Sequence, residues 1–267
     1  MNNKPPIKKY DITQCALYKC RTKKRLKQLL DLKIGNIKAI NNIIRYHSFE
    51  IYKKNSKEKR QITSPNKALK LVQKRILHLL QKVIRPDWLI SGEKQKCYID
   101  NGKTHLNQQY FLTVDIKKFY DNCTREPVYQ FFIKKLKTSF DVAEILTNIV
   151  TYNDGIPTGC PTSQIIAFYA YIDMFTEINN LAQKYNCIFT LYVDDMTFSS
   201  KSAFPPHQLT HEIDCILRKY GHRPKYSKIK YYSPLIINIL QELLLHQNKH
   251  LLYQMYFKKQ YMTNFRT

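Results

Sequence analysis

Two adjacent aspartates, Asp194 and Asp195, stand inside the apolar and β-branched run FTLYVDDMTFSS (189–200). Such a run has the composition of a β-strand. A carboxylate buried in a strand is unfavourable by several kcal/mol unless it is paired, protonated or bound to a metal. The sequence therefore predicts a positively charged group beside these two residues.

A third aspartate, Asp115, ends the β-like run YFLTVD within YFLTVDIKKFYDN (110–122). A lone aspartate at the end of a strand is commonly a turn or capping residue. Two strands side by side in one antiparallel sheet would, however, bring the three carboxylates to one point. Carboxylate oxygens are the ligands that Mg²⁺ prefers, and two such ions about 3.5–4 Å apart stabilise both oxygens of a phosphoryl transfer. The acids are thus those of a candidate polymerase.

The net charge indicates the kind of partner. The chain has 267 residues with 44 Lys and Arg against 20 Asp and Glu, a formal charge of +24 that is spread along the sequence. Such a field attracts a polyanion, most often a nucleic acid. A basic protein encoded by an AT-rich genome is the alternative that charge alone leaves open.

The cysteines and the N-terminus exclude several classes of protein. The seven cysteines are scattered and include no C-x-x-C pair, which argues against a disulfide framework and a zinc site. The start MNNKPPIKKYDITQ lacks an apolar signal core, and no stretch approaches about 18 uninterrupted apolar residues. We therefore expect a cytoplasmic protein that does not contact membranes.

Several elements can be predicted before the aspartates. Residues 16–46 have a basic helical pattern with a break at Gly35, and SFEIYKKNSKEKRQITSP (48–65) favours two short strands joined by a charged turn. A helix is then expected with Ser64 as its cap and Pro65 at its first position. Its polar face carries Lys67, Lys70 and Lys74, which form either a solvated surface or a wall along a nucleic-acid backbone.

Five sequence blocks resemble those of bacterial reverse transcriptases, in the same order. LYVDDMTFS resembles the Y-x-D-D motif, and TVDIKKFY resembles D-I-K-x-F-[FY]. GIPTGCPTSQIIAFYAYIDMF (155–175) resembles L-P-x-G-x-x-x-S, KEKRQITSPNKALKLVQKRI resembles R-x-I-x-x-P-x-x-x-L-x-x-[IV]-Q, and DNGKTH resembles N-A-x-x-H. The variants are most similar to retron and other defence-associated enzymes.

The resemblance implies an α+β, right-hand polymerase fold with fingers, a palm built on an antiparallel sheet, and a reduced or truncated thumb. It divides the chain into a basic helical segment (1–48), fingers and palm (49–233) and a short thumb-like tail (234–267).

The resemblance also assigns the catalytic groups. Asp115, Asp194 and Asp195 would bind two Mg²⁺ ions, for which Mn²⁺ can substitute, with the main-chain carbonyl of Ile116 completing the ligand shell. One ion would activate the primer 3′-hydroxyl and the other would hold the triphosphate and the leaving pyrophosphate. Lys228, in PKYSKIKYYS, matches a lysine that protonates pyrophosphate, and Lys225 competes for that role.

Further residues would bind the nucleotide. Arg60 would contact the triphosphate, because a guanidinium suits bidentate phosphate binding. Tyr120, five residues after Asp115, would be a steric gate against the 2′-hydroxyl, or else a core tyrosine. The turn beneath the incoming base pair would be formed by Thr158, where many relatives carry Gln, and by Gly159, Pro161 and Ser163.

We therefore expect an RNA-directed DNA polymerase that uses dNTPs, a dedicated non-coding RNA and an effector protein in a retron or related antiphage system. Asn101 and His105 match positions of the family without an assigned role, and a lone histidine is commonly structural. The alternatives are an RNA-directed RNA polymerase, a template-independent nucleotidyltransferase, and a weakly active or inactive RNA-binding scaffold.

Overall fold

The computed structural model describes residues 8–32, 40, 42–52, 59–93 and 96–234. These residues form an α+β structure, as predicted, in two compact units. The first unit groups 1–50, 61–87 and 118–172, and the second groups 51–60, 88–117 and 173–267. Gly35 and nearly all of the expected thumb-like tail (234–267) lie outside the described residues.

Within 16–46, the residues that the structure describes contain less helix than the sequence pattern predicts. Helix α1 covers only Lys23–Leu29, and the side chain of Thr22 caps it by accepting the N–H of Arg25 at 3.2 Å. Left-handed residues stand on both sides of it, Lys19 with φ 53° and Asp31 with φ 51°. A right-handed helix cannot continue through such residues, so the helix is one of two turns.

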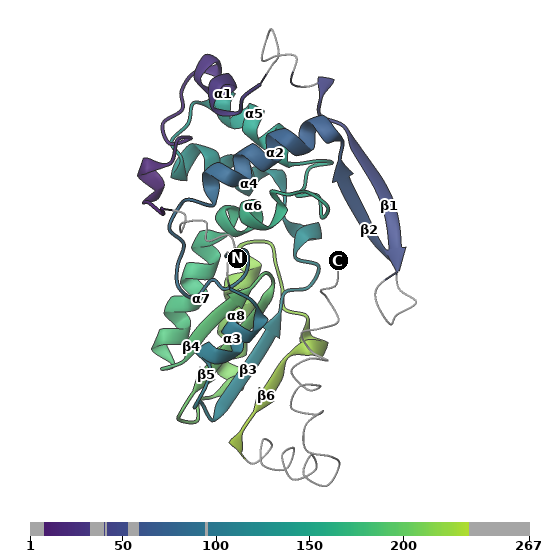
Figure 1. Ribbon diagram of the computed structural model, residues 1–267. Helices are drawn as coiled ribbons and strands as arrows, with labels where there is room; N and C mark the ends of the chain where they lie inside the picture. Colours follow the sequence, from purple (N-terminus) through teal and green to yellow (C-terminus); the bar gives the residue numbers. More distant parts are fainter. Residues whose placement is uncertain (1–7, 33–39, 41, 53–58, 94–95, 235–267) are drawn as a thin grey trace, which may run out of the picture. The chain divides into compact units, whose positions relative to one another are not determined.

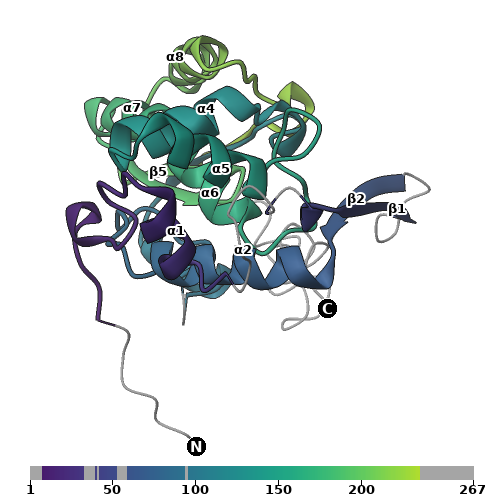
Figure 2. The same ribbon diagram turned by 90° about the horizontal axis from the view of Figure 1, so that it is seen from above.

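The next elements are a hairpin and a helix. Strands β1 (Tyr46–Tyr52) and β2 (Lys59–Pro65) form the predicted two-stranded sheet, and the hydroxyls of Ser48 and Thr63 are 3.0 Å apart. Helix α2 (Lys67–Leu80) follows directly, and Figure 2 shows the hairpin extending from its N-terminal end. The helix cap is Asn66, not Ser64, because the Asn66 side chain accepts the N–H of Leu69 at 2.8 Å.

Three further helices complete the first unit: α4 (Arg125–Gln130), α5 (Phe140–Val150) and α6 (Ser163–Ala170). A π-helical turn (Phe131–Lys135) continues α4, and the ring of Phe131 stacks on that of Tyr169 at 5.0 Å between centroids. The core of this unit is made of apolar side chains from these helices and from α2, including Leu69, Ile76, Leu80, Val128, Phe132, Leu146, Ile149 and Ile166.

The second unit is built on a four-stranded antiparallel sheet in the order β4-β5-β3-β6 (Figure 1). Its strands are β3 (Tyr110–Asp115), β4 (Ile188–Tyr192), β5 (Asp195–Ser200) and β6 (Lys230–Tyr232). Three helices lie against it: α3 (Tyr98–Thr104), α7 (Ile172–Lys184) and α8 (Pro206–Lys219).

The two faces of this sheet differ in chemistry, because successive side chains of a strand point to opposite faces. Leu112 and Val114 of β3 share one face with Met196 and Phe198 of β5, and all four are buried. Apart from Phe111 of β3, the alternate residues of the same strands are polar and share the other face: Thr113, Asp115, Asp195, Thr197 and Ser199. The alternation therefore places Asp115 and Asp195 together on the polar face.

The outer edge of β4 is covered by another segment of the second unit. Leu191 donates its N–H to the carbonyl of Trp88 at 2.8 Å and accepts the N–H of Ile90 at 3.0 Å. Leu89 thus forms a parallel bridge with Leu191. In the part of the chain that the structure describes, no helix is both long and apolar enough to cross a membrane.

Candidate active site

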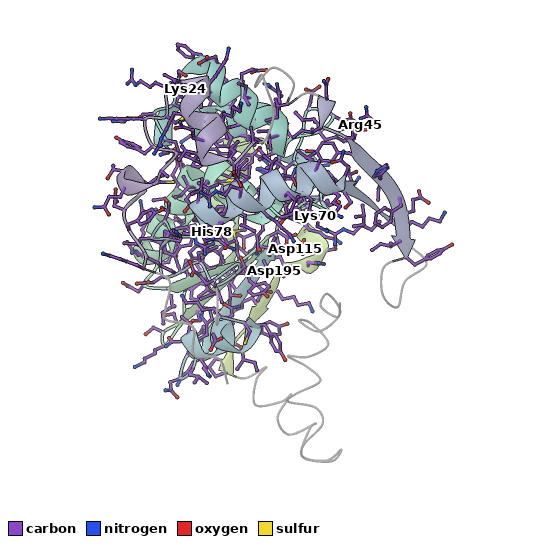
Figure 3. The ribbon with its side chains drawn as sticks, turned by 45° about the horizontal axis from the view of Figure 1, so that its top comes forward. Lys24, Arg45, Lys70, His78, Asp115 and Asp195 are labelled. Atoms are coloured by element: carbon purple, nitrogen blue, oxygen red, sulfur yellow. The ribbon has the colours of Figure 1, made fainter. Side chains whose placement is uncertain are left out.

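The three aspartates meet at one end of the sheet. Asp115, the last residue of β3, is paired in register with Asp195, the first residue of β5, and Figure 3 shows the two close together. Asp194 precedes Asp195 in the turn, and its carbonyl accepts the N–H of Ile116 at 3.1 Å. The sheet register and one main-chain hydrogen bond therefore bring together residues that are far apart in the sequence.

The turn that carries Asp194 has an unfavourable backbone conformation. Val193 and Asp194 connect β4 to β5, and Val193 has φ 61°. A two-residue hairpin turn requires positive φ at its first position, which glycine adopts easily but a β-branched residue adopts at a penalty of about 1–3 kcal/mol. The N–H of Val193 donates to the Ser91 hydroxyl at 2.9 Å, and this bond helps to hold the turn.

The environment disfavours the charged form of two aspartates. Burial, and then the charge of Asp115, raise the pKa of Asp194 to about 6. Burial, and then the charges of Asp194 and Asp115, raise the pKa of Asp195 to about 7. The positive charges of Lys228 and Arg60 act in the opposite direction on Asp194 without cancelling the effect. The site thus holds more negative charge than its own cations neutralise.

Lys228 is the lysine that reaches these carboxylates. Its Nζ donates to Oδ2 of Asp115. Burial by itself would lower the pKa of Lys228, but the hydrogen bond to Asp115 and the three negative charges outweigh it and raise that pKa. Lys225 instead donates its main-chain N–H to the carbonyl of Asp115 at 2.7 Å. Of the two lysines that the sequence offers, the structure therefore places the ammonium of Lys228 at the acids.

The donor set fits a divalent cation that arrives with a phosphate-bearing substrate. Among the described residues, no three acidic, histidine or cysteine side chains are gathered tightly enough to form a metal site by themselves. Mg²⁺, however, is usually held by one or two carboxylates together with substrate phosphates and water. Carboxylates that raise one another's pKa are relieved by a bound cation. A divalent cation therefore suits this site because Asp115, Asp194 and Asp195 supply carboxylate oxygens and an excess of negative charge.

The predicted nucleotide-binding turn lies in the first unit, against strand β2. Gly159 donates its N–H to the Thr63 carbonyl at 3.0 Å, and a Cβ at Gly159 would come within 2.6 Å of that oxygen. The Thr158 hydroxyl donates to the Gln61 carbonyl at 3.2 Å. The glycine is therefore required by the close approach of two backbones, and the Thr158 side chain contacts the hairpin.

The other predicted residues of the first unit have separate environments. The buried Ser163 hydroxyl donates to the Pro157 carbonyl and so closes the loop around the half-buried Pro161. Tyr120 is half-buried at the start of a 3₁₀ turn, with its ring centroid 5.5 Å from that of Phe119. Neither environment decides between a nucleotide contact and a packing role, so both assignments stay predictions.

The lysines of α2 are on its outer face. Lys67, Lys70 and Lys74 are exposed, and Figure 3 shows Lys70 on the same helix as His78. Arg60, the second residue of β2, is exposed too and belongs to the second unit. The predicted phosphate-binding residues are thus accessible to a ligand.

Two contacts near the aspartates could not be predicted from motifs. Ser91 carries no local signal, because its partner Val193 is about a hundred residues away in the chain. His105 is marked in the sequence only by its match to a family position. In the structure its two ring nitrogens contact Ser199 and Thr190, on the two strands that lead to the aspartate turn.

Comparison with known proteins finds similarity to reverse transcriptases, both in a family model and in individual proteins. The family model described as reverse transcriptase (RNA-dependent DNA polymerase) matches residues 51–257. The chain is 27% identical over 172 residues to the Retron Se72 reverse transcriptase of Salmonella heidelberg (strain 579083-10), covering 64% of this chain and 45% of that protein.

Two proteins of Escherichia coli are similar as well. The identity is 28% to the Retron Ec86 reverse transcriptase, covering 59% of this chain and 50% of that protein. The identity is 27% to the Retron Ec48 reverse transcriptase, and the match covers 74% of this chain and 52% of that protein. The chain therefore spans about half the length of the curated relatives it matches.

Proposed function

We propose that this chain, which belongs to the reverse transcriptase (RNA-dependent DNA polymerase) family, copies RNA into DNA from deoxynucleoside triphosphates. One observation carries the proposal. The sheet register sets Asp115 opposite Asp195, with Asp194 beside them and the ammonium of Lys228 on Asp115. This arrangement suits phosphoryl transfer, because the carboxylates could hold the divalent cations that such a reaction uses and the ammonium could interact with negative charge on the leaving group.

Each residue of the site then has a distinct task. Asp115, Asp194 and Asp195 would hold two Mg²⁺ or Mn²⁺ ions, with the Ile116 carbonyl as a further ligand. When bound, such ions lower the pKa of a hydroxyl nucleophile and neutralise a triphosphate. Lys228 carries a proton within reach of this point, so it can donate to the leaving pyrophosphate.

Further residues that the resemblance singles out would bind the nucleotide. Arg60 would contact the triphosphate, Tyr120 would exclude ribonucleotides, and the turn of Gly159, Pro161 and Ser163 would lie under the base pair. In this assignment residues 49–233 are the fingers and palm of a right-hand polymerase, and 234–267 are a thumb-like tail. The support is the order of the five sequence blocks and the antiparallel sheet that carries the acids.

The proposed template is a dedicated non-coding RNA. The relatives named above are retron reverse transcriptases, and the first unit exposes cations on α1 and α2, of which Figure 3 labels Lys24 and Lys70. A polyanion that lies along Lys67, Lys70 and Lys74 would release counterions on binding. We place the protein in the cytoplasm, in an antiphage system in which an effector protein is a further partner.

A primer-extension assay tests the proposal. Purified protein is given Mg²⁺, a primed RNA or DNA template, and either dNTPs or rNTPs. We expect products that require the RNA template and dNTPs. Products from rNTPs would instead indicate an RNA-directed RNA polymerase, and products without a template would indicate a terminal nucleotidyltransferase. RNA binding without extension would indicate a scaffold and would refute the proposed activity.

A further inference from the structure

His105 lies at the centre of a buried polar cluster in the second unit. Its Nδ1 is 2.6 Å from the hydroxyl of Ser199, and its Nε2 is 2.7 Å from the hydroxyl of Thr190. All three side chains are buried, with Thr190 and Ser199 fully inaccessible to solvent. Each of the two ring nitrogens thus has a hydrogen-bond partner inside the protein.

The two partners lie on different strands of one hairpin. Thr190 belongs to β4 and is paired with Thr197, and Ser199 belongs to β5 and is paired with Ile188. The two hydroxyls are therefore diagonal neighbours on one face of the pair, and the imidazole ring spans the gap between the strands. The same two strands end at the turn that carries Asp194 and Asp195.

Ser199 also shares its face of β5 with Asp195. Side chains four residues apart on a strand point to the same side, and Thr197 lies between these two. A change in the twist of the hairpin at Ser199 would therefore be transmitted along β5 to the carboxylate of Asp195.

We propose that His105 is a positioning residue for Asp194 and Asp195, since it fixes the relative placement of β4 and β5. The strained turn at Val193 makes such support necessary, because a hairpin that stores backbone strain relaxes unless its strands are held. Ser91 holds the turn itself, and His105 holds the strands behind it. The catalytic consequence rests on the proposed function, whereas the structural role does not.

A neutral imidazole suits this task better than an apolar ring. It offers one donor and one acceptor nitrogen, and each hydroxyl can take the complementary role. An apolar ring of similar size would fill the space but would leave two buried hydroxyls without partners. Burial keeps the ring neutral, because it lowers the pKa of His105 to about 4.

The test uses the full chain and compares His105→Phe with Ile213→Ala. Ile213 is buried on α8, an element that carries none of the three residues of this cluster, so its variant serves as a control for lost stability. Hydrogen exchange is measured over residues 188–200, and Mn²⁺ affinity is measured by electron paramagnetic resonance. We expect His105→Phe to speed exchange in this segment and to weaken Mn²⁺ binding by about tenfold, as loss of a supporting residue behind a metal ligand typically does. Ile213→Ala should leave both the exchange in this segment and the Mn²⁺ affinity unchanged, even when it lowers the melting temperature as much as His105→Phe does.

Conservative variants add a second criterion. His105→Gln keeps a donor and an acceptor and should recover part of the Mn²⁺ affinity. If His105→Phe is insoluble, the same two measurements are made on Thr190→Val and on Ser199→Ala. Each of these variants removes one of the two hydrogen bonds of His105. In nucleotide incorporation, kcat should fall while the KM for dNTP stays nearly unchanged.

The proposal is overturned if His105→Phe and the stability-matched Ile213→Ala show the same exchange and the same Mn²⁺ affinity. His105 would then be a packing residue only. A wild-type protein that incorporates no nucleotide would refute the proposed polymerase activity instead. The exchange and Mn²⁺ measurements would still decide the role of His105.

Discussion

Asp115 and Asp195 face each other directly across two neighbouring antiparallel strands. Like charges in directly opposed positions destabilise a sheet. The raised pKa of Asp195 reflects burial first, and then the charges of Asp194 and Asp115. Lys228 offsets part of the repulsion through its bond to Asp115. The end of the sheet is therefore arranged for charge chemistry at the expense of its own stability.

Asp194→Asn should abolish dNTP incorporation while RNA binding is retained. The substitution removes a proposed metal ligand worth several kcal/mol, so the rate should fall by about three orders of magnitude or more. It should not lower the melting temperature, because burial already disfavours the charged form, as the raised pKa of Asp194 shows. Primer extension, filter binding and thermal unfolding measure the three quantities. Normal extension would remove Asp194 from the site.

Tyr120→Val should increase the use of rNTPs relative to dNTPs. If the ring is a steric gate, its removal relieves a clash of about 1–3 kcal/mol, which corresponds to roughly tenfold or more in the ratio of kcat/KM values. Competition between labelled rNTPs and dNTPs gives this ratio. A ratio that stays the same would leave Tyr120 as a packing residue beside Phe119.

Gly159→Ala should destabilise the first unit by about 1–3 kcal/mol, the range for overpacking. The new methyl group would meet the carbonyl oxygen of Thr63 at 2.6 Å. Gly102→Ala is the matched control, because a Cβ there meets nothing within 4 Å and Gly102 lies inside helix α3. That variant should gain about 0.5–1 kcal/mol from helix propensity. Urea unfolding would compare them, and equal effects would contradict the close contact.

The stability that His105 contributes should decrease as pH falls. Its pKa is about 4 in the folded protein, compared with about 6.5 when unfolded. The contribution is therefore complete above about pH 6.5 and is lost as the pH falls toward 4. Between pH 6.5 and pH 5, wild type should lose up to about 2 kcal/mol more than His105→Gln.

The comparison with His105→Gln is needed because other groups titrate in the same range. Buried His222 also has its pKa lowered to about 4 and acts in the same direction as His105. Asp194 and Asp195, whose pKa values are raised, act in the opposite direction. Urea midpoints at each pH give the difference between the two proteins, and equal losses would show that His105 is not titrating as stated.

Replacing Lys67, Lys70 and Lys74 together by Gln should weaken RNA binding and reduce its dependence on salt. If each lysine contacts a phosphate of a single strand, the slope of log K against log salt should decrease by about 2. A control with the same change in net charge is the replacement of exposed Lys134, Lys137 and Lys201 by Gln. Titrations at several salt concentrations distinguish the two sets. An equal change in both would mean that only the overall charge matters.

Sequence reasoning located the acids because the signal was local. An aspartate that ends an alternating β-like run marks its own strand end, and the family resemblance implied an antiparallel sheet in which the two aspartate-bearing strands could lie side by side. It failed where two local rules competed: Ser64 followed by Pro65 is a good helix start, but both residues belong to β2, and Asn66 caps the helix instead. The positive φ of Lys19 and Asp31, which limits α1, is also not marked in the sequence, because neither residue is a glycine.

The supporting contacts were beyond the sequence for a different reason. His105 and Ser199 are 94 residues apart, and Ser91 and Val193 are 102 apart. A hydroxyl or an imidazole shows nothing in its neighbours about a partner at such a distance. Only the paired strands reveal that these side chains surround the hairpin of the aspartates.

The covered edge of β4 also affects how the protein meets other chains. An open edge strand presents unpaired N–H and carbonyl groups to which a foreign strand can add, which is a common route to aggregation and to domain swapping. Here Leu191 already bonds to both Trp88 and Ile90. An invading strand would first have to displace that segment, so the sheet that carries the three aspartates resists self-association at this edge.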